Sequence, residues 1–248
     1  MTTALAYHFA SGQAYFSGIA LITLAVGLAW RKAGRWWSLT RTVAGLTGLI
    51  LIAGSATPAP WWFYALAGST TIVWIGLERT TSERFRSMRR GFRGAVLAAW
   101  WLGAALEIPY HLIPTLPPAR NPVVTVIGDS ISAGVGGETS TWPKLLADQR
   151  GIKVIDLSVA GLDVAKALPQ ARLVVVFLEL PLPPTYNQFG MIQRRLAARH
   201  KAWLVPKRVL MGILASGGAT LDSIHLSEAG HSRMARTIGN ILGPTFAR

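Results

Sequence analysis

The chain has 248 residues, of which 51% are hydrophobic and only 15% are charged, and it contains ten tryptophans and no cysteine. The absence of cysteine excludes disulfides, thiolate metal sites and a cysteine nucleophile, and so large an apolar fraction is unusual for a soluble domain. The formal charge of +14 is compatible with a nucleic-acid partner, but the basic residues of the first half lie in short clusters between apolar runs. We therefore expect no nucleic-acid partner and interpret the clusters as signs of membrane topology.

The first half contains four apolar runs that predict transmembrane helices. A basic start and a small-residue cleavage site are both missing before the first run, so we expect an uncleaved helix there. The second run reaches the roughly 20 residues that a bilayer needs only if flanking residues are counted. The runs cover about residues 14–30, 42–56, 61–77 and 95–113.

Two basic clusters orient these runs. The first cluster is Arg31, Lys32, Arg35 and Arg41, and the second consists of arginines within residues 79–93, whereas residues 57–60 carry no charge. Because basic loops tend to stay in the cytoplasm, we expect a multi-pass cell-membrane protein whose N-terminus and C-terminal half lie on the outer, periplasmic or extracellular side. The alternative for the second cluster is a patch that binds anionic lipid or nucleic acid.

The predicted domains are a transmembrane region over residues 1–114, a proline-rich linker over 115–122, and a C-terminal domain over 123–248. Glu107 lies near the outer end of the fourth run, where it is either a functional intramembrane carboxylate or a side chain that reaches the interface near His111. Small residues four apart at Ala44 and Gly48 are compatible with close helix contact.

From residue 123 onward, short strands alternate with helices, which predicts an α/β three-layer domain with a parallel sheet. The apolar run Leu173 to Leu180 is typical of a strand buried in such a sheet. The other expected strands are 123–127, 153–157 and 202–205, and the expected helices are 142–149, 162–168, 188–200 and 228–242.

Ser130 is the candidate nucleophile. It follows the first strand in Gly128-Asp129-Ser130, and Gly128 allows the backbone to turn sharply into a helix. The serine hydroxyl then lies where backbone N–H groups point outward and can stabilise negative charge.

Asp222 and His225 are the candidate acid and base. They precede a helix that Ser227 is suited to cap. With two residues between them in a turn, the carboxylate can hold one imidazole nitrogen while the other nitrogen faces a serine, and a buried Asp222 would stabilise the imidazolium. His231, six residues further on, is expected to pack or to cap.

Together, Gly128-Asp129-Ser130 after a strand and Asp222-x-x-His225-Leu-Ser-x-x-Gly230-His231 near the C-terminus resemble the SGNH/GDSL hydrolase family, over about residues 123 to 243. The resemblance implies a three-layer flavodoxin-like fold, a Ser130 nucleophile that also donates its backbone N–H, a second oxyanion donor at Gly161, His225 as general base and Asp222 as its orienting carboxylate. It implies no metal and no cofactor.

The family's Gly-x-Asn-Asp block, whose Asn is the third oxyanion donor, is missing between Gly161 and Asp222. Either the chain lacks a central strand, which we favour, or residues 173–180 take that place with Asn187 as a distant substitute. We expect a membrane-anchored serine esterase that acts on a small-molecule, glycan or lipid acyl ester. The alternatives are a catalytically impaired membrane protein that binds or scaffolds, and an acyltransferase.

Overall fold

The computed structural model describes residues 2–30, 34–80, 82–118, 123–128, 130–136, 138–159, 176–222 and 224–246. The chain divides into two compact units, each with its own hydrophobic core. Unit 1 comprises residues 1–111 and 181–193, and unit 2 comprises residues 112–180 and 194–248.

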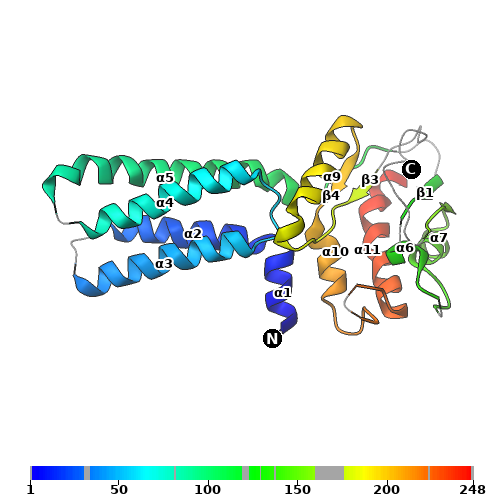
Figure 1. Cartoon of the computed structure of the whole chain (residues 1–248). Helices are drawn as coiled ribbons and strands as arrows, with labels where there is room; N and C mark the ends of the chain where they lie inside the picture. The colour runs from blue at the N-terminus through cyan, green and yellow to red at the C-terminus, as the bar shows by residue number, and fades with distance from the viewer. Residues whose placement is uncertain are drawn as a thin grey trace. The chain divides into compact units, whose positions relative to one another are not determined.

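Unit 1 is helical (Figure 1). The short α1 meets α2 at Gly12, whose φ of 86° is left-handed and therefore favours glycine. The long helices α3, α4 and α5 follow, and the first half of α9 also belongs to this unit. The bounds are α1 (Thr2–Ala10), α2 (Gln13–Leu28), α3 (Arg35–Gly54), α4 (Trp61–Arg79), η1 (Glu83–Phe85), α5 (Arg86–Glu107), η2 (Ile108–His111), η4 (Pro184–Tyr186) and α9 (Asn187–Arg199).

Helices α2 and α3 approach each other closely at two glycines. A Cβ built on Gly48 would lie 2.7 Å from the carbonyl oxygen of Gly18, and a Cβ on Gly18 would lie 2.5 Å from that of Gly48. Any side chain at either position would push the two backbones apart. The predicted close helix contact at Gly48 is confirmed.

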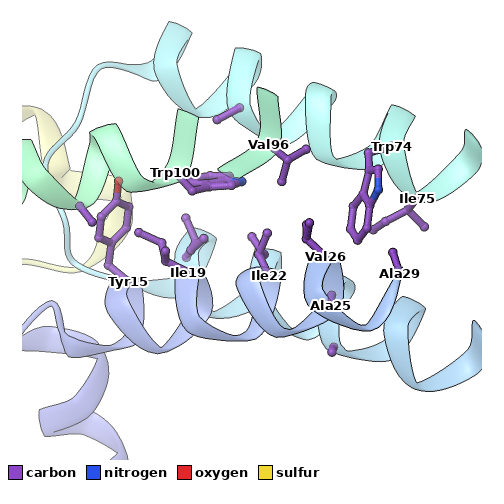
Figure 2. Packing of buried hydrophobic residues seen from close by; sticks show 14 residues of the cluster. Tyr15, Ile19, Ile22, Ala25, Val26, Ala29, Trp74, Ile75, Val96 and Trp100 are labelled. Atoms are coloured by element: carbon purple, nitrogen blue, oxygen red, sulfur yellow. The ribbon is translucent and has the colours of Figure 1, made fainter. Parts of the chain in front are cut away.

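The core of unit 1 is built around tryptophans (Figure 2). Tyr15, Ile19 and Ile22 form one buried row along α2, spaced as neighbouring helical turns require, and Trp100 of α5 lies over this row. The indole Nε1 of Trp100 donates to the Thr71 hydroxyl at 2.9 Å. A large buried ring therefore also has its polar atom satisfied.

The prediction of four transmembrane helices is wrong. Among the described helices, only α3 is by itself long and apolar enough to cross a membrane, and α1 with α2 passes only as a pair bent by 83°. The reasons are local, because α2 has 16 residues, the first two turns of α5 hold four arginines, and α4 contains several polar and aromatic side chains. Glu107, at the end of α5, is buried and lies 3.4 Å from Nε2 of His111.

Unit 2 contains the strands and the remaining helices. Helix α7 starts with Pro143 in its first turn and ends at Gly151, whose φ is 61°. Helix α11 begins after Ser227, whose Oγ accepts a hydrogen bond from the Gly230 N–H at 3.2 Å, so the predicted cap is confirmed. The bounds are β1 (Val123–Val126), α6 (Ser130–Ala133), α7 (Trp142–Arg150), β2 (Lys153–Asp156), β3 (Val176–Leu178), β4 (Trp203–Val205), α10 (Lys207–Leu214) and α11 (Glu228–Phe246).

The predicted three-layer flavodoxin-like domain with one parallel sheet is also wrong. The described residues are 68% helical, and their strands form two separate parallel pairs. β1 pairs with β2 from Val123↔Lys153 to Val126↔Asp156, and β3 pairs with β4 from Val176↔Trp203 to Leu178↔Val205. Within the described residues no strand joins the two pairs, and a pair of three or four residues is too small to form a layer. Residues 160–175, where a central strand would lie in the sequence, are outside the described residues.

The core of unit 2 lies between the two strand pairs and helices α7, α10 and α11. Its most buried members include Leu146 of α7, Leu210 of α10 and Met234 of α11, together with Leu226 of the loop that carries Asp222 and His225. The burial of Leu226 fixes that loop to the core although its neighbours Leu221 and Ile224 are exposed.

Candidate active site

Ser130 is the first residue of α6 and is half-buried. The helix predicted after it is only one turn, closed by the Gly134 N–H donating to the Ser130 carbonyl at 3.0 Å. Asp129 lies outside the described residues. Ser130 therefore follows a parallel strand in the predicted order, on a shorter helix than expected.

Gly128 is required by the packing of this turn. A Cβ at position 128 would lie 2.7 Å from the Cβ of Ser132, which is buried, and real Cβ atoms essentially never approach so closely. The carbonyl oxygen of Gly128 also accepts a hydrogen bond from the Val159 N–H at 3.0 Å. The turn before Ser130 is thus held between α6 and the segment that follows β2.

Asp222 and His225 are in direct contact. The Oδ2 of Asp222 lies 2.7 Å from Nδ1 of His225, and its Oδ1 accepts the backbone N–H groups of Ile224 and His225, both at 2.8 Å. The hydrogen bond from the His225 ring, and then those two backbone donors, hold the pKa of the Asp222 carboxyl well below its usual range. An ionised Asp222 keeps the proton on Nδ1, so Nε2 carries the lone pair.

The burial expected for Asp222 is not found. Its side chain is 58% exposed, whereas that of His225 is 32% exposed. Water therefore screens the charge of Asp222, which weakens its effect on an imidazolium but leaves its control of the tautomer intact. The two backbone hydrogen bonds, rather than burial, keep the carboxylate in place.

Thr139, nine residues after Ser130, and the Asp222–His225 loop each make hydrogen bonds at the start of the same helix, α11. Past α6, the Thr139 hydroxyl donates to Oε1 of Glu228 at 2.5 Å, which lowers the pKa of the Glu228 carboxyl. At the loop, the Ser227 hydroxyl donates to the Gly218 carbonyl at 2.5 Å and the Leu221 N–H donates to the His225 carbonyl at 2.8 Å. Both candidate elements belong to unit 2, and their roles in catalysis stay predictions.

His231 packs inside the unit, as expected. It is fully buried, and its Nδ1 accepts the backbone N–H of Trp142 at 3.1 Å, at the first residue of α7. Its Nε2 is buried and has no hydrogen-bond partner among the described residues. Burial lowers the pKa of His231, and the charge of Glu138 opposes that shift. His231 thus joins α7 to α11 in its neutral form.

Of the two remaining oxyanion candidates, the structure describes only Asn187. Gly161, the second predicted backbone donor, lies outside the described residues. Asn187, the distant substitute donor, is in unit 1 and its amide donates to the Ser55 carbonyl at 3.5 Å. Among the described residues no cluster of three or more His, Cys, Asp or Glu side chains could hold a metal ion.

The buried ion pair between Glu179 and Arg194 was not predicted from the sequence. Glu179 lies inside the run predicted to be a buried strand and is 1% exposed. Its Oε1 accepts a hydrogen bond from Nε of Arg194 at 2.7 Å. Its Oε2 also accepts the Lys207 N–H at 3.4 Å. A glutamate within an apolar run could have predicted this pair, because a buried glutamate almost always has a charged partner. The pair ties the end of β3 to α9 and to the start of α10.

Comparisons of the chain with protein-family models, with curated proteins and with solved structures find no match. The chemistry proposed for this site therefore depends on the residues and contacts described above.

Proposed function

We propose that the chain is a membrane-associated serine ester hydrolase that acts through an acyl-enzyme on Ser130. The observation that carries the proposal is the Asp222–His225 contact at 2.7 Å. It leaves Nε2 of His225 as the only ring nitrogen able to accept a proton. A base with a fixed tautomer, a serine after a parallel strand, and the resemblance to SGNH/GDSL hydrolases all favour the same reaction.

In the proposed reaction, His225 Nε2 takes the proton of the Ser130 hydroxyl as Oγ attacks the acyl carbonyl carbon. The oxyanion is stabilised by the backbone N–H of Ser130 and, by resemblance, that of Gly161. The alcohol leaves with the proton from His225. Water then attacks the acyl carbon, His225 takes the proton of that water, and the acid is released as the proton returns to Ser130. Lacking the third donor, the enzyme is expected to turn over about 10²–10³ times more slowly than a complete site would.

The proposed substrate is an ester of an apolar acyl group. Exposed aliphatic side chains flank each candidate element: Val135 follows α6, Val159 follows β2, and Leu221 and Ile224 adjoin the acid and base. Exposed aliphatic groups gathered next to catalytic groups favour an acyl chain over a sugar hydroxyl face.

Membrane association is proposed from unit 1. Its outer surface exposes large apolar side chains, including Trp61 and Leu66 on α4 and Leu102 and Leu106 on α5, each more than half exposed. A surface of this kind on a soluble monomer would be an aggregation hazard, whereas lipid would cover it. The proposed location of unit 2 is the outer side of the membrane.

Labelling of the full chain with a fluorophosphonate tests the ester chemistry. We expect labelling and hydrolysis of a short-chain aryl ester by the parent chain, complete loss in Ser130→Ala, and retention in Ser140→Ala, which removes a nearby hydroxyl outside the site. An absence of Ser130-dependent labelling and hydrolysis would defeat the enzyme proposal.

A binding or scaffolding protein is the second candidate. It is favoured by the missing Asn block and by the 58% exposure of the Asp222 side chain, since catalytic carboxylates of this kind are usually buried. A chain that folds and binds an acyl ester without hydrolysing it would support this second function.

A further inference from the structure

One end of the long helices of unit 1 is strongly basic. The basic end is defined as residues 35–41 and 78–93 without residue 81, where α3 and α5 begin and α4 ends. These residues contain eight arginines and two glutamates, a net charge of eight minus two, or +6. Arg31 and Lys32, which the sequence analysis grouped with them, lie outside the described residues.

A buried ion network brings the three helix ends together. Glu78 of α4 lies 3.4 Å from Nη1 of Arg41 in α3 and 2.7 Å from Nε of Arg93 in α5. The side chains of Arg41 and Glu78 are 8% and 5% exposed. One carboxylate between two guanidinium groups leaves an excess positive charge inside the network, which favours an anion at this end of the unit.

Exposed arginines lie at the same end of the unit. Arg84 and Arg90 are exposed, and so is Arg86, whose contact with Glu83 at 2.6 Å is itself on the surface. A pair so exposed is screened by water and neutralises little. Arg89 turns back to donate to the Thr80 carbonyl at 2.7 Å, which fixes the loop between α4 and α5. The exposed guanidinium groups of Arg84 and Arg90 suit the bidentate recognition of phosphate.

An apolar stripe begins at the same end. Trp36, Leu39, Val43, Leu46 and Ile50 are all exposed and follow one face of α3 at intervals of three and four residues. Nucleic acid offers an anionic surface without an apolar layer beneath it. A phospholipid layer offers both, with phosphate groups above acyl chains.

We infer that the basic end binds the phosphate headgroups of anionic phospholipids while the stripe on α3 contacts their acyl chains. The inference rests on the membrane association proposed above and is independent of the ester chemistry. Each basic residue near an anionic lipid surface contributes about a fivefold preference, so three exposed arginines together are expected to contribute about 100-fold.

The test measures flotation of the full chain, kept soluble by an amphipathic polymer, with vesicles of phosphatidylcholine alone or mixed with phosphatidylglycerol. We expect tighter binding to the anionic vesicles and a loss of about 100-fold in that preference for the triple variant Arg84→Gln, Arg86→Gln, Arg90→Gln. The matched control is Arg195→Gln, Arg199→Gln, Arg236→Gln, which removes the same charge from exposed positions of unit 2 and should keep the preference.

Five outcomes would overturn the inference. Equal binding of the parent chain to both vesicle types would show that the basic end does not recognise anionic headgroups, and so would equal losses in both triple variants. Either result would leave membrane association itself standing. Binding to neither vesicle would remove membrane association itself. Displacement from anionic vesicles by duplex DNA at equal phosphate concentration would favour a nucleic-acid partner. Finally, if Leu39→Ser, Val43→Ser, Leu46→Ser converts a dimer into a monomer without weakening vesicle binding, the stripe contacts a second copy of the chain.

Discussion

Replacement of Asp222 by asparagine is the most direct probe of the proposed base. The Asp222 carboxylate accepts from Nδ1 of His225 at 2.7 Å. An asparagine can turn its amide N–H₂ toward that nitrogen, which moves the imidazole proton to Nε2. Nε2 can then no longer take the proton of Ser130, so hydrolysis should fall while the fold is kept.

The expected loss follows from the exposure of the carboxylate. In a buried triad the same substitution lowers turnover by about 10⁴. Because the Asp222 side chain is 58% exposed, water already screens its attraction for the imidazolium in the parent chain. For two charge centres about 4 Å apart, the attraction in water is about 3 kcal/mol weaker than near a protein surface, which is about 10² in rate. We therefore expect Asp222→Asn to lower turnover by about 10².

The assay is steady-state hydrolysis of a short-chain aryl ester by the full chain, with Ser130→Ala as the background rate. Asp148→Asn is the matched control, because Asp148 is an exposed aspartate on α7 outside the site, and it should leave the rate unchanged. A turnover of Asp222→Asn equal to that of the parent chain would refute the assignment of His225 as a base oriented by Asp222.

Three further predictions concern packing and pH. Gly128→Ala should destabilise the fold by about 1–3 kcal/mol, because the new methyl group would lie 2.7 Å from the Cβ of Ser132; chemical unfolding measures this. Since burial lowers the pKa of His231 below its ordinary 6.5, the unfolded chain takes up the proton first, so stability should be full above about pH 6.5 and should fall as the pH drops below it; unfolding between pH 5 and 8 measures the slope. Trp100→Ala should destabilise unit 1 by about 3–5 kcal/mol, because its buried ring is lost together with the hydrogen bond to Thr71; the thermal midpoint reports this.

Each of these has a control. Gly217→Ala introduces a methyl group that meets no atom within 4 Å in the described part of the chain, apart from its own chain neighbours, and should be near neutral. His231→Gln keeps an acceptor for the Trp142 N–H but cannot titrate, and a pH slope unchanged in this variant would contradict the assignment to His231. Trp101 is 55% exposed, so a loss in Trp101→Ala as large as that in Trp100→Ala would contradict the core described for unit 1.

Features that depend on near neighbours could be predicted from the amino-acid sequence alone. The strand before Ser130, the proline that starts α7, the Ser227 cap of α11 and the Asp222–His225 contact are each set by residues within a few positions of one another. Local backbone propensity and short side-chain reach decide such features, so a pattern in the sequence is sufficient.

How these elements combine could be seen only in the three-dimensional structure. Whether β1–β2 and β3–β4 form one sheet or two pairs depends on whether a strand lies between them, and no local pattern in either pair carries that information. Two contacts likewise join distant residues: Glu179 is buried against Arg194, and His231 contacts the start of α7, 89 positions away. The exposure of Asp222 also depends on the surrounding fold. The same holds for the predicted membrane spans. The four apolar runs formed helices, but α3 is the one described helix that is by itself long and apolar enough to cross a membrane. Packing and desolvation act between distant segments, and for that reason composition indicated an apolar protein without fixing its architecture.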